Sequence, residues 1–195
     1  VRRGAQRPGF AGSAALLNPT LLATAIVILG GVVRYFVIVP ASWGQSAITV
    51  PGALTALGSL LDVGFGLIAL LMARGERSPF LLLLIALWPI HVFVCFLALS
   101  KNVLIISLLL PVIGAYAGRQ RLKQLVVGLG VIAVIFAMSQ DWVHYGRGVI
   151  YERTQTIDQA GFEERVEILF DYVGDRRSDS SPVFERQGWW TRENF

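Results

Sequence analysis

Long apolar segments separated by short polar ones make up the first 139 residues of the chain. A helix needs about 20 apolar residues, with a range of about 17–25, to cross the hydrocarbon core of a bilayer. Five segments meet or approach that length: 20–39, 50–73, 80–99, 103–117 and 124–138. The last two are short and need their flanking residues, or a tilt of their neighbours, to cross. The pattern predicts an all-α fold in which about five transmembrane helices form a bundle.

Only Ser100, Lys101 and Asn102 separate the third apolar segment from the fourth. A continuous helix over residues 80–117 would be about 57 Å long, nearly twice the thickness of the hydrocarbon core. We therefore expect the chain to turn at 100–102, with the turn at a face of the membrane.

Residues 140–195 are more polar, and we predict an ordered loop that lies against the membrane. Asp158 can cap a helix over 159–173, and Gly174 can end it. The apolar residues of this helix recur at helical spacing and give it one apolar face. They are Phe162, Val166, Leu169, Phe170 and Val173. Because the first residue is Val1 rather than Met, we expect a piece of a longer membrane protein with further spans.

The composition excludes several classes of protein. Hydrophobic residues make up 54% of the chain and charged residues only 15%, with a mean hydropathy of +0.61, which is too apolar for an ordinary soluble domain or a disordered chain. A single cysteine excludes a disulfide scaffold. The net charge is +4, but the basic residues stand in short clusters between apolar segments. We therefore expect the lipid bilayer as a partner and no nucleic acid.

The basic clusters predict an orientation in the membrane. Short loops rich in Lys and Arg face the cytoplasm. With five spans, three basic clusters fall on one side: Arg2, Arg3 and Arg7; Arg74 and Arg77; and Arg119, Arg121 and Lys123. We expect a cytoplasmic N-terminus and an extracytoplasmic segment 140–195. If the fourth or fifth segment does not span, the C-terminal part is cytoplasmic instead.

The turn at Ser100 and Lys101 is a candidate anion site. Ser100 is a natural N-cap for the fourth helix, which puts Lys101 in the first turn. A cation there opposes the helix dipole, and it makes sense if an anion such as phosphate binds beside it. Alternatively, Lys101 simply marks an exposed turn between hydrophobic helices.

Three ionisable residues lie inside apolar segments: Arg34, Asp62 and His91. Ionisable groups at such depth are costly and are functional candidates. Arg34 and Asp62 can pair with each other, or Arg34 can extend its side chain toward the membrane face. His91 can relay protons, or it can be a hydrogen-bonded packing residue.

His144 follows the fifth apolar segment, with Arg147, Glu152 and Arg153 close behind. A histidine within reach of carboxylates can act as a base, or it can be an ordinary residue of the membrane face. The basic residues from 140 onward are all arginines: Arg147, Arg153, Arg165, Arg176, Arg177, Arg186 and Arg192. Arginine binds phosphate through paired hydrogen bonds, which fits a loop that holds a pyrophosphate or an acidic sugar. Alternatively, the neighbouring acidic residues neutralise these arginines in weak surface pairs.

No motif indicates a metal or a cofactor. The chain has no P-loop, HExxH or GxSxG sequence and no GxGxxG after a strand. His91 is a lone histidine with no motif of metal-ligand spacing around it. We therefore expect no metal site and no cofactor.

The stretch 96–123, FLALSKNVLIISLLLPVIGAYAGRQRLK, resembles the bacterial O-antigen polymerase/ligase superfamily. The shared pattern is a small-residue turn with a basic residue, an apolar helix, a basic cytoplasmic loop, another helix and a large periplasmic loop. In this chain Ser100 and Lys101 match the turn, and residues 140–195 match the start of the large loop. The family usually has Arg at the turn, where this chain has Lys101.

The resemblance implies metal-independent glycosyl transfer in the bacterial inner membrane, with an undecaprenyl-diphosphate-linked oligosaccharide as substrate. Other membrane proteins of polysaccharide assembly are then possible partners. The catalytic candidates are Lys101, Arg147 and His144. The substrate-binding candidates are Ser100, Arg153, Arg34, Arg165 and Trp142. The basic residues would stabilise charge on the departing diphosphate, a His or carboxylate would deprotonate the acceptor hydroxyl, and Trp142 would stack on a sugar.

Two alternatives stay open. In a secondary transporter, Asp62, Arg34 and His91 would form the ion or substrate path, although no convincing internal repeat is visible. In a non-enzymatic membrane scaffold, the helix 159–173 would bind a partner protein through its apolar face.

Overall fold

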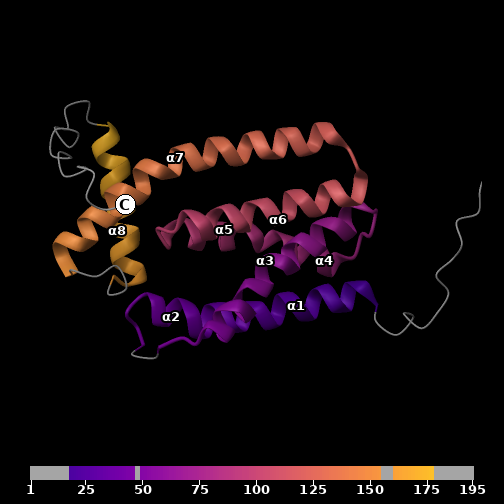
Figure 1. Cartoon of the computed structure of the whole chain (residues 1–195), viewed down its shortest axis with the longest axis horizontal. Coiled ribbons are helices and arrows are strands. Elements are labelled where there is room, and N and C mark those ends of the chain that lie inside the picture. Colours follow the sequence, from indigo (N-terminus) through magenta and orange to yellow (C-terminus); the bar gives the residue numbers. More distant parts are fainter. Residues whose placement is uncertain (1–17, 47–48, 155–159, 178–195) are drawn as a thin grey trace, which may run out of the picture.

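The computed structural model describes residues 18–46, 49–154 and 160–177, and every regular element in these ranges is a helix (Figure 1). The elements are α1 (Pro19–Val33), the π-helix η1 (Arg34–Ile38), α2 (Val39–Ser42), α3 (Gly52–Ala73), α4 (Pro79–Ala86), α5 (Trp88–Leu97), α6 (Lys101–Arg119), α7 (Leu122–Thr154) and α8 (Phe162–Arg177). The predicted all-α fold is confirmed.

Five helical stretches are long and apolar enough to cross a membrane. They are Pro19–Ser42, Gly52–Ala73, Pro79–Leu97, Lys101–Arg119 and Leu122–Arg153. Each one contains most of a segment that the hydrophobic pattern predicts. The chain turns between α5 and α6 at 98–100, two residues earlier than the predicted 100–102. The protein is therefore a multi-pass helical membrane protein.

The helix α7 is much longer than the predicted segment 124–138. It has 33 residues and is about 50 Å long. The apolar part of the sequence ends at 139, but the helix continues past this position without interruption. The added turns contain no proline, and they bury Trp142, Val143 and Ile150 in an apolar cluster with the end of α5. Tertiary packing of one face therefore extends the helix into polar sequence.

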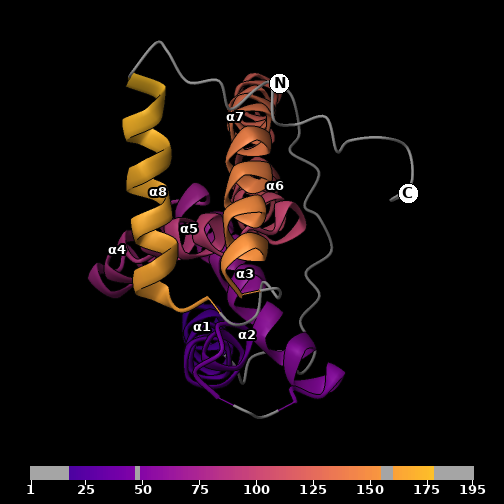
Figure 2. The ribbon, with the colours of Figure 1, turned by 90° about the vertical axis from the view of Figure 1, so that its left-hand side faces the viewer.

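The amphipathic helix of the C-terminal part is present as α8, with different bounds. It starts at Phe162 and ends at Arg177, so Gly174 lies inside it and does not end it. The predicted N-cap, Asp158, lies outside the described residues. Figures 1 and 2 show α8 lying crosswise over one end of the bundle, where Ile168 packs beside Trp142 of α7.

The central helix of the bundle is α3, which packs against α1 on one side and α6 on the other. Glycines allow both close approaches. A Cβ on Gly30 of α1 would collide with the backbone at Leu61, and a Cβ on Gly114 of α6 would collide with the carbonyl oxygen of Gly66. Small residues bring membrane helices into backbone contact in this way. Lipid is as apolar as the helix surface, so the hydrophobic effect does not drive the helices together and close packing has to do so.

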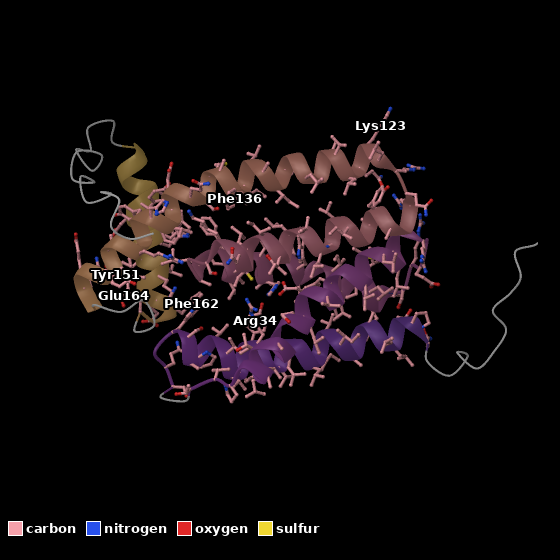
Figure 3. All side chains as sticks on the ribbon, viewed as in Figure 1. Arg34, Lys123, Phe136, Tyr151, Phe162 and Glu164 are labelled. Carbon is pink, nitrogen blue, oxygen red and sulfur yellow. The ribbon has the colours of Figure 1, made fainter. Side chains whose placement is uncertain are left out.

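Two basic clusters lie at the same end of the bundle. Arg119, after which α6 ends, donates from Nε to the carbonyl oxygen of Ala73, 3.1 Å away at the end of α3. Lys123 lies at this end too, opposite α8 and the turn between α5 and α6 (Figure 3). This arrangement agrees with the five-span interpretation; Arg2, Arg3 and Arg7 lie outside the described residues.

Candidate functional site

Most of the predicted site residues meet around the turn between α5 and α6. We call this group, composed of Ser100, Lys101, Trp142, His144, Arg147 and Arg165, the turn site. The last carbonyl groups of any helix have no partner within the helix. At the end of α5 these carbonyls are bonded by side chains of α7 and α8, and this brings three chain segments together.

Three side chains of the turn site bond the end of α5. Trp142 Nε1 donates to the carbonyl oxygen of Phe96 at 3.0 Å. Arg165 Nη1 donates to that of Leu97 at 3.0 Å. Arg147 donates to that of Leu99 from Nε at 3.1 Å and from Nη2 at 2.8 Å. Cations are favourable at a helix C-terminus, so both arginines stabilise the end of α5 through charge as well as hydrogen bonds.

The turn itself is tight. Leu99 has a φ of 53°, a left-handed conformation that ends the helix before Ser100. The two hydrogen bonds from Arg147 reach the carbonyl of this same residue. Arg147 therefore holds the strained residue that sets the direction of α6.

Arg165 is almost fully buried, with 1% of its surface exposed. Its Nε donates to the carbonyl oxygen of Ala160 at 2.9 Å, and its guanidinium carbon lies 5.2 Å from the ring centroid of Trp43. Trp43 in turn stacks on Phe162 at the start of α8. A buried charge needs such partners, and here they tie α8 to the loop after α2 and to α5.

Trp142 is also buried, with 1% of its surface exposed. Its ring stacks on Phe96 at a centroid distance of 5.5 Å, and Tyr172 lies at 5.6 Å. The ring is therefore packed between protein side chains, where it supports the turn.

Lys101 and His144 form a pair of titratable side chains in contact within the turn site. Lys101 Nζ lies 3.3 Å from His144 Nε2, and both residues are half-buried. A lysine ammonium can only donate, so Nε2 accepts and the ring carries its proton on Nδ1. Ser100 is the N-cap residue of α6, as predicted, but its hydroxyl makes no capping hydrogen bond.

Arg153 lies further along α7, away from the turn. Its Nη1 is 4.0 Å from Glu164 Oε1 and 3.9 Å from Glu167 Oε1, and 43% of its side chain is exposed. These are the weak surface pairs of the alternative interpretation, and they contribute little to stability.

Arg34 is not part of the turn site. It lies inside the bundle (Figure 3) and belongs to a polar group that we call the His91 cluster, composed of Arg34, Tyr35, Asp62, His91 and Cys95. Asp62 Oδ1 lies 2.8 Å from His91 Nε2, and the hydroxyl oxygen of Tyr35 lies 2.8 Å from His91 Nδ1. Arg34 Nη2 lies 3.7 Å from the sulfur of Cys95.

The suggested pairing of Arg34 with Asp62 is wrong in this structure, because Asp62 pairs with His91. Tyr35 and Cys95, also members of the cluster, were not predicted from the sequence. Two signals were present: Tyr35 adjoins Arg34, and Cys95 lies four residues after His91, on the same face of a helix.

The π-helix η1, directly after α1, positions Arg34 and Tyr35 in the cluster. Val39 N–H bonds the carbonyl oxygen of Arg34, five residues earlier. Pro40 is the cause, because it has no N–H to donate to the carbonyl oxygen of Phe36 and its ring crowds this carbonyl. Such π-turns are frequent at functional sites. Here both Arg34 and Tyr35 contact α5.

Within the described ranges, no group of three or more His, Cys, Asp or Glu residues is arranged to hold a metal ion. No family model, curated protein or solved structure matches this chain. The fold alone therefore defines its class, which is that of multi-pass helical membrane proteins.

Proposed function

We propose that the turn site takes part in glycosyl transfer from a lipid-diphosphate-linked oligosaccharide at the membrane face. The contact between Lys101 Nζ and His144 Nε2, at 3.3 Å, is the observation that carries this proposal. It joins a cation that can bind a diphosphate to a neutral imidazole that can accept a proton. Both residues stand at the end of a membrane bundle, where a lipid-linked substrate and a water-soluble acceptor can meet.

The contact suggests how substrate binding prepares the base. When a diphosphate binds, the Lys101 ammonium moves from His144 Nε2 to the phosphate oxygens. Nε2, no longer in contact with the ammonium, then takes the proton of the acceptor hydroxyl. The acceptor oxygen bonds to the anomeric carbon while the bond from that carbon to the diphosphate oxygen breaks. The lipid diphosphate leaves with its negative charge stabilised by Lys101.

Arg147, Arg165 and Trp142 support the reaction as positioning residues. Each bonds a carbonyl oxygen near the end of α5 and so fixes the start of α6, where Lys101 stands. A displacement of about 1 Å at a reacting group can reduce a rate about 100-fold. The turn therefore fixes the backbone of Lys101 beside α7, where its ammonium can reach both His144 and a bound diphosphate.

The charge distribution supports an orientation with the turn site on the extracytoplasmic side of a bacterial inner membrane. The basic residues Arg74, Arg77, Arg119, Arg121 and Lys123 would then face the cytoplasm, as the bias of short loops requires. A membrane-impermeant thiol label tests this. In intact cells, Glu167→Cys should react and Arg121→Cys should not; the native Cys95 is buried. The reverse pattern contradicts the orientation.

The chain offers a matched control for the catalytic test, because Lys101 and Lys123 are its two lysines. Lys123 lies at the opposite end of the bundle (Figure 3). We expect Lys101→Ala to lower the rate of glycan transfer about 100-fold, the size typical of removing one donor to a developing negative charge. Lys123→Ala should leave the rate unchanged.

The assay is glycan lengthening in membranes supplied with undecaprenyl-diphosphate-linked oligosaccharide, at equal protein levels of all variants. Equal transfer by Lys101→Ala and Lys123→Ala rules out the proposed role of the turn site. Lys101→Arg is a further check, since it keeps the charge and restores the residue usual at this position in the family that the chain resembles.

A further inference from the structure

The His91 cluster is not used by the proposed transfer, and it has the properties of a separate site. Asp62 and His91 are 2% and 1% exposed, and they come from different helices, α3 and α5. Buried ionisable groups inside a membrane bundle are costly, and they commonly mark ion or proton paths.

The hydrogen bonds of the cluster form a directed chain. An ionised carboxylate only accepts, so His91 Nε2–H donates to Asp62 Oδ1 at 2.8 Å. Nδ1 of the neutral ring is then an acceptor, and the hydroxyl of Tyr35 donates to it at 2.8 Å. One uninterrupted line of hydrogen bonds therefore runs from Tyr35 through the imidazole to Asp62.

The same partners also suit a protonated ring. Asp62 compensates the charge at Nε2, and the Tyr35 hydroxyl can rotate from donating to accepting at Nδ1. Phe65 stacks on the ring at a centroid distance of 5.5 Å and an interplanar angle of 29°, which places a negative π-face against a cation. Both charge states of His91 thus have a complete set of partners.

The charges around His91 come from few groups. Arg34 and Tyr35 face the cluster from η1, Asp62 from α3 and Cys95 from α5. The α4 sequence has no titratable residue, and the titratable residues of α6 lie in its first or last turn. With Asp62 ionised and His91 neutral, the cationic Arg34 balances the cluster, so one added proton gives it a single positive charge.

Tyr35 is the member of the cluster that can connect the buried imidazole of His91 to solvent. It is half-buried, whereas Asp62 and His91 are fully buried. Tyr35 stands seven residues before Ser42, where the first span ends, which is about 10 Å along the helix axis. This is the end of the bundle that carries α8 (Figure 1).

We propose that the His91 cluster is a proton-binding site, at which His91 takes up one proton on Nδ1 through Tyr35 while Asp62 compensates the imidazolium charge. A proton arrives at the hydroxyl oxygen of Tyr35 as the proton of that hydroxyl passes to Nδ1. Tyr35 ends neutral, and the cluster gains one positive charge. The bundle therefore carries a proton-linked step of its own, distinct from chemistry at the turn site.

The two histidines of the chain make this site directly observable. In the His144→Gln variant, labelled with nitrogen-15 histidine and placed in lipid nanodiscs, the remaining imidazole signals belong to His91. We expect a neutral ring with its proton on Nε2 at high pH and a reversible change to imidazolium as the pH falls. A purely structural histidine would keep one form wherever the helices persist by circular dichroism.

Two further variants in this background test the partners. Asp62→Asn should weaken the imidazolium signal at every pH, because an amide carries no compensating charge, whereas Asp171→Asn on the exposed side of α8 should not. Tyr35→Phe should slow exchange of the Nδ1 proton with water, measured in the same spectra.

The proposal fails if His91 keeps a single form over the pH range of the folded protein. It also fails if Asp62→Asn and Asp171→Asn give the same titration. Should Asp62→Asn not fold, the titration of the His144→Gln protein and the exchange rate in Tyr35→Phe decide the matter. Neither measurement depends on glycan transfer, so the outcome is independent of the proposed function.

Discussion

The two polar regions of this protein use similar residues in opposite ways. In the turn site, arginine and tryptophan side chains bond backbone carbonyls at the end of α5, and Lys101 is half-buried. In the His91 cluster, side chains bond one another inside the bundle, and the backbone contributes nothing to these bonds. The first arrangement supplies hydrogen-bond donors to the unpaired carbonyls of a helix end, which every helix end needs. The second satisfies no helix end, which is why we propose a separate role for it.

The largest effect should come from breaking the buried pair in the His91 cluster. Asp62→Ala leaves the Nε2–H group of His91 without its acceptor in the bundle interior. Removal of one partner of a buried pair costs about 3–5 kcal/mol, and we expect a loss of that size in the free energy of unfolding. Unfolding in mixed micelles of mild detergent and dodecyl sulfate measures it. A loss as small as that of an exposed variant would mean that water reaches the pair.

A smaller effect should follow from removing the buried arginine of the turn site. Arg165→Ala leaves the carbonyl oxygens of Leu97 and Ala160 without their donor. We expect a loss of about 1.5–3 kcal/mol, the range for hydrogen bonds of a charged group, in the same unfolding measurement. Limited proteolysis should also show earlier cleavage around α8. Unchanged cleavage would indicate that the apolar contacts of α8 suffice to hold it.

A double-mutant cycle sharpens the difference between the two regions. Asp62→Ala combined with His91→Ala removes both partners, so no unpaired group remains inside the bundle. The combined loss of stability should be smaller than the sum of the single losses by on the order of 1–2 kcal/mol. A control cycle for Asp62 and Arg153, which lie in different clusters and contact different residues, should be additive. Additivity of the Asp62 and His91 cycle would show that their hydrogen bond contributes nothing.

The smallest effect should come from the surface pairs of α7 and α8. Arg153→Ala removes two contacts with Glu164 and Glu167, both near 4 Å and solvent-exposed. We expect a change below about 1 kcal/mol, which shrinks further at high salt. A larger, salt-insensitive loss would place Arg153 among the groups that hold the fold.

The sequence predicted the helices well where their signals are local. Apolar length located all five spans, and the polar residues 100–102 located the turn to within two residues, since it lies at 98–100. The end of α7 escaped prediction, because its last turns are held by contacts of Trp142 and Ile150 with residues far along the chain. Pro89 causes the helix break before His91, and Pro40 causes the π-helix at Arg34. Both prolines can be read from the sequence, but the backbone geometry that each produces cannot.

The candidate sites were predictable as residue types but not as partners. Lys101 and His144 were both candidates, and 43 residues separate them; only the antiparallel packing of α6 and α7 puts their nitrogens 3.3 Å apart. A pair of Asp62 with Arg34 was one of two alternatives, and the register of α3 against α5 gives Asp62 the partner His91 instead.

By itself, the sequence determined that this protein crosses a membrane several times as helices, because length and apolarity decide insertion residue by residue. The tertiary structure alone decided which polar groups meet. Partners in a bundle depend on the rotation and register of each helix about its neighbours, and these are set by close contacts such as Gly66 with Gly114. Such contacts join positions far apart in the chain, where no local pattern records them.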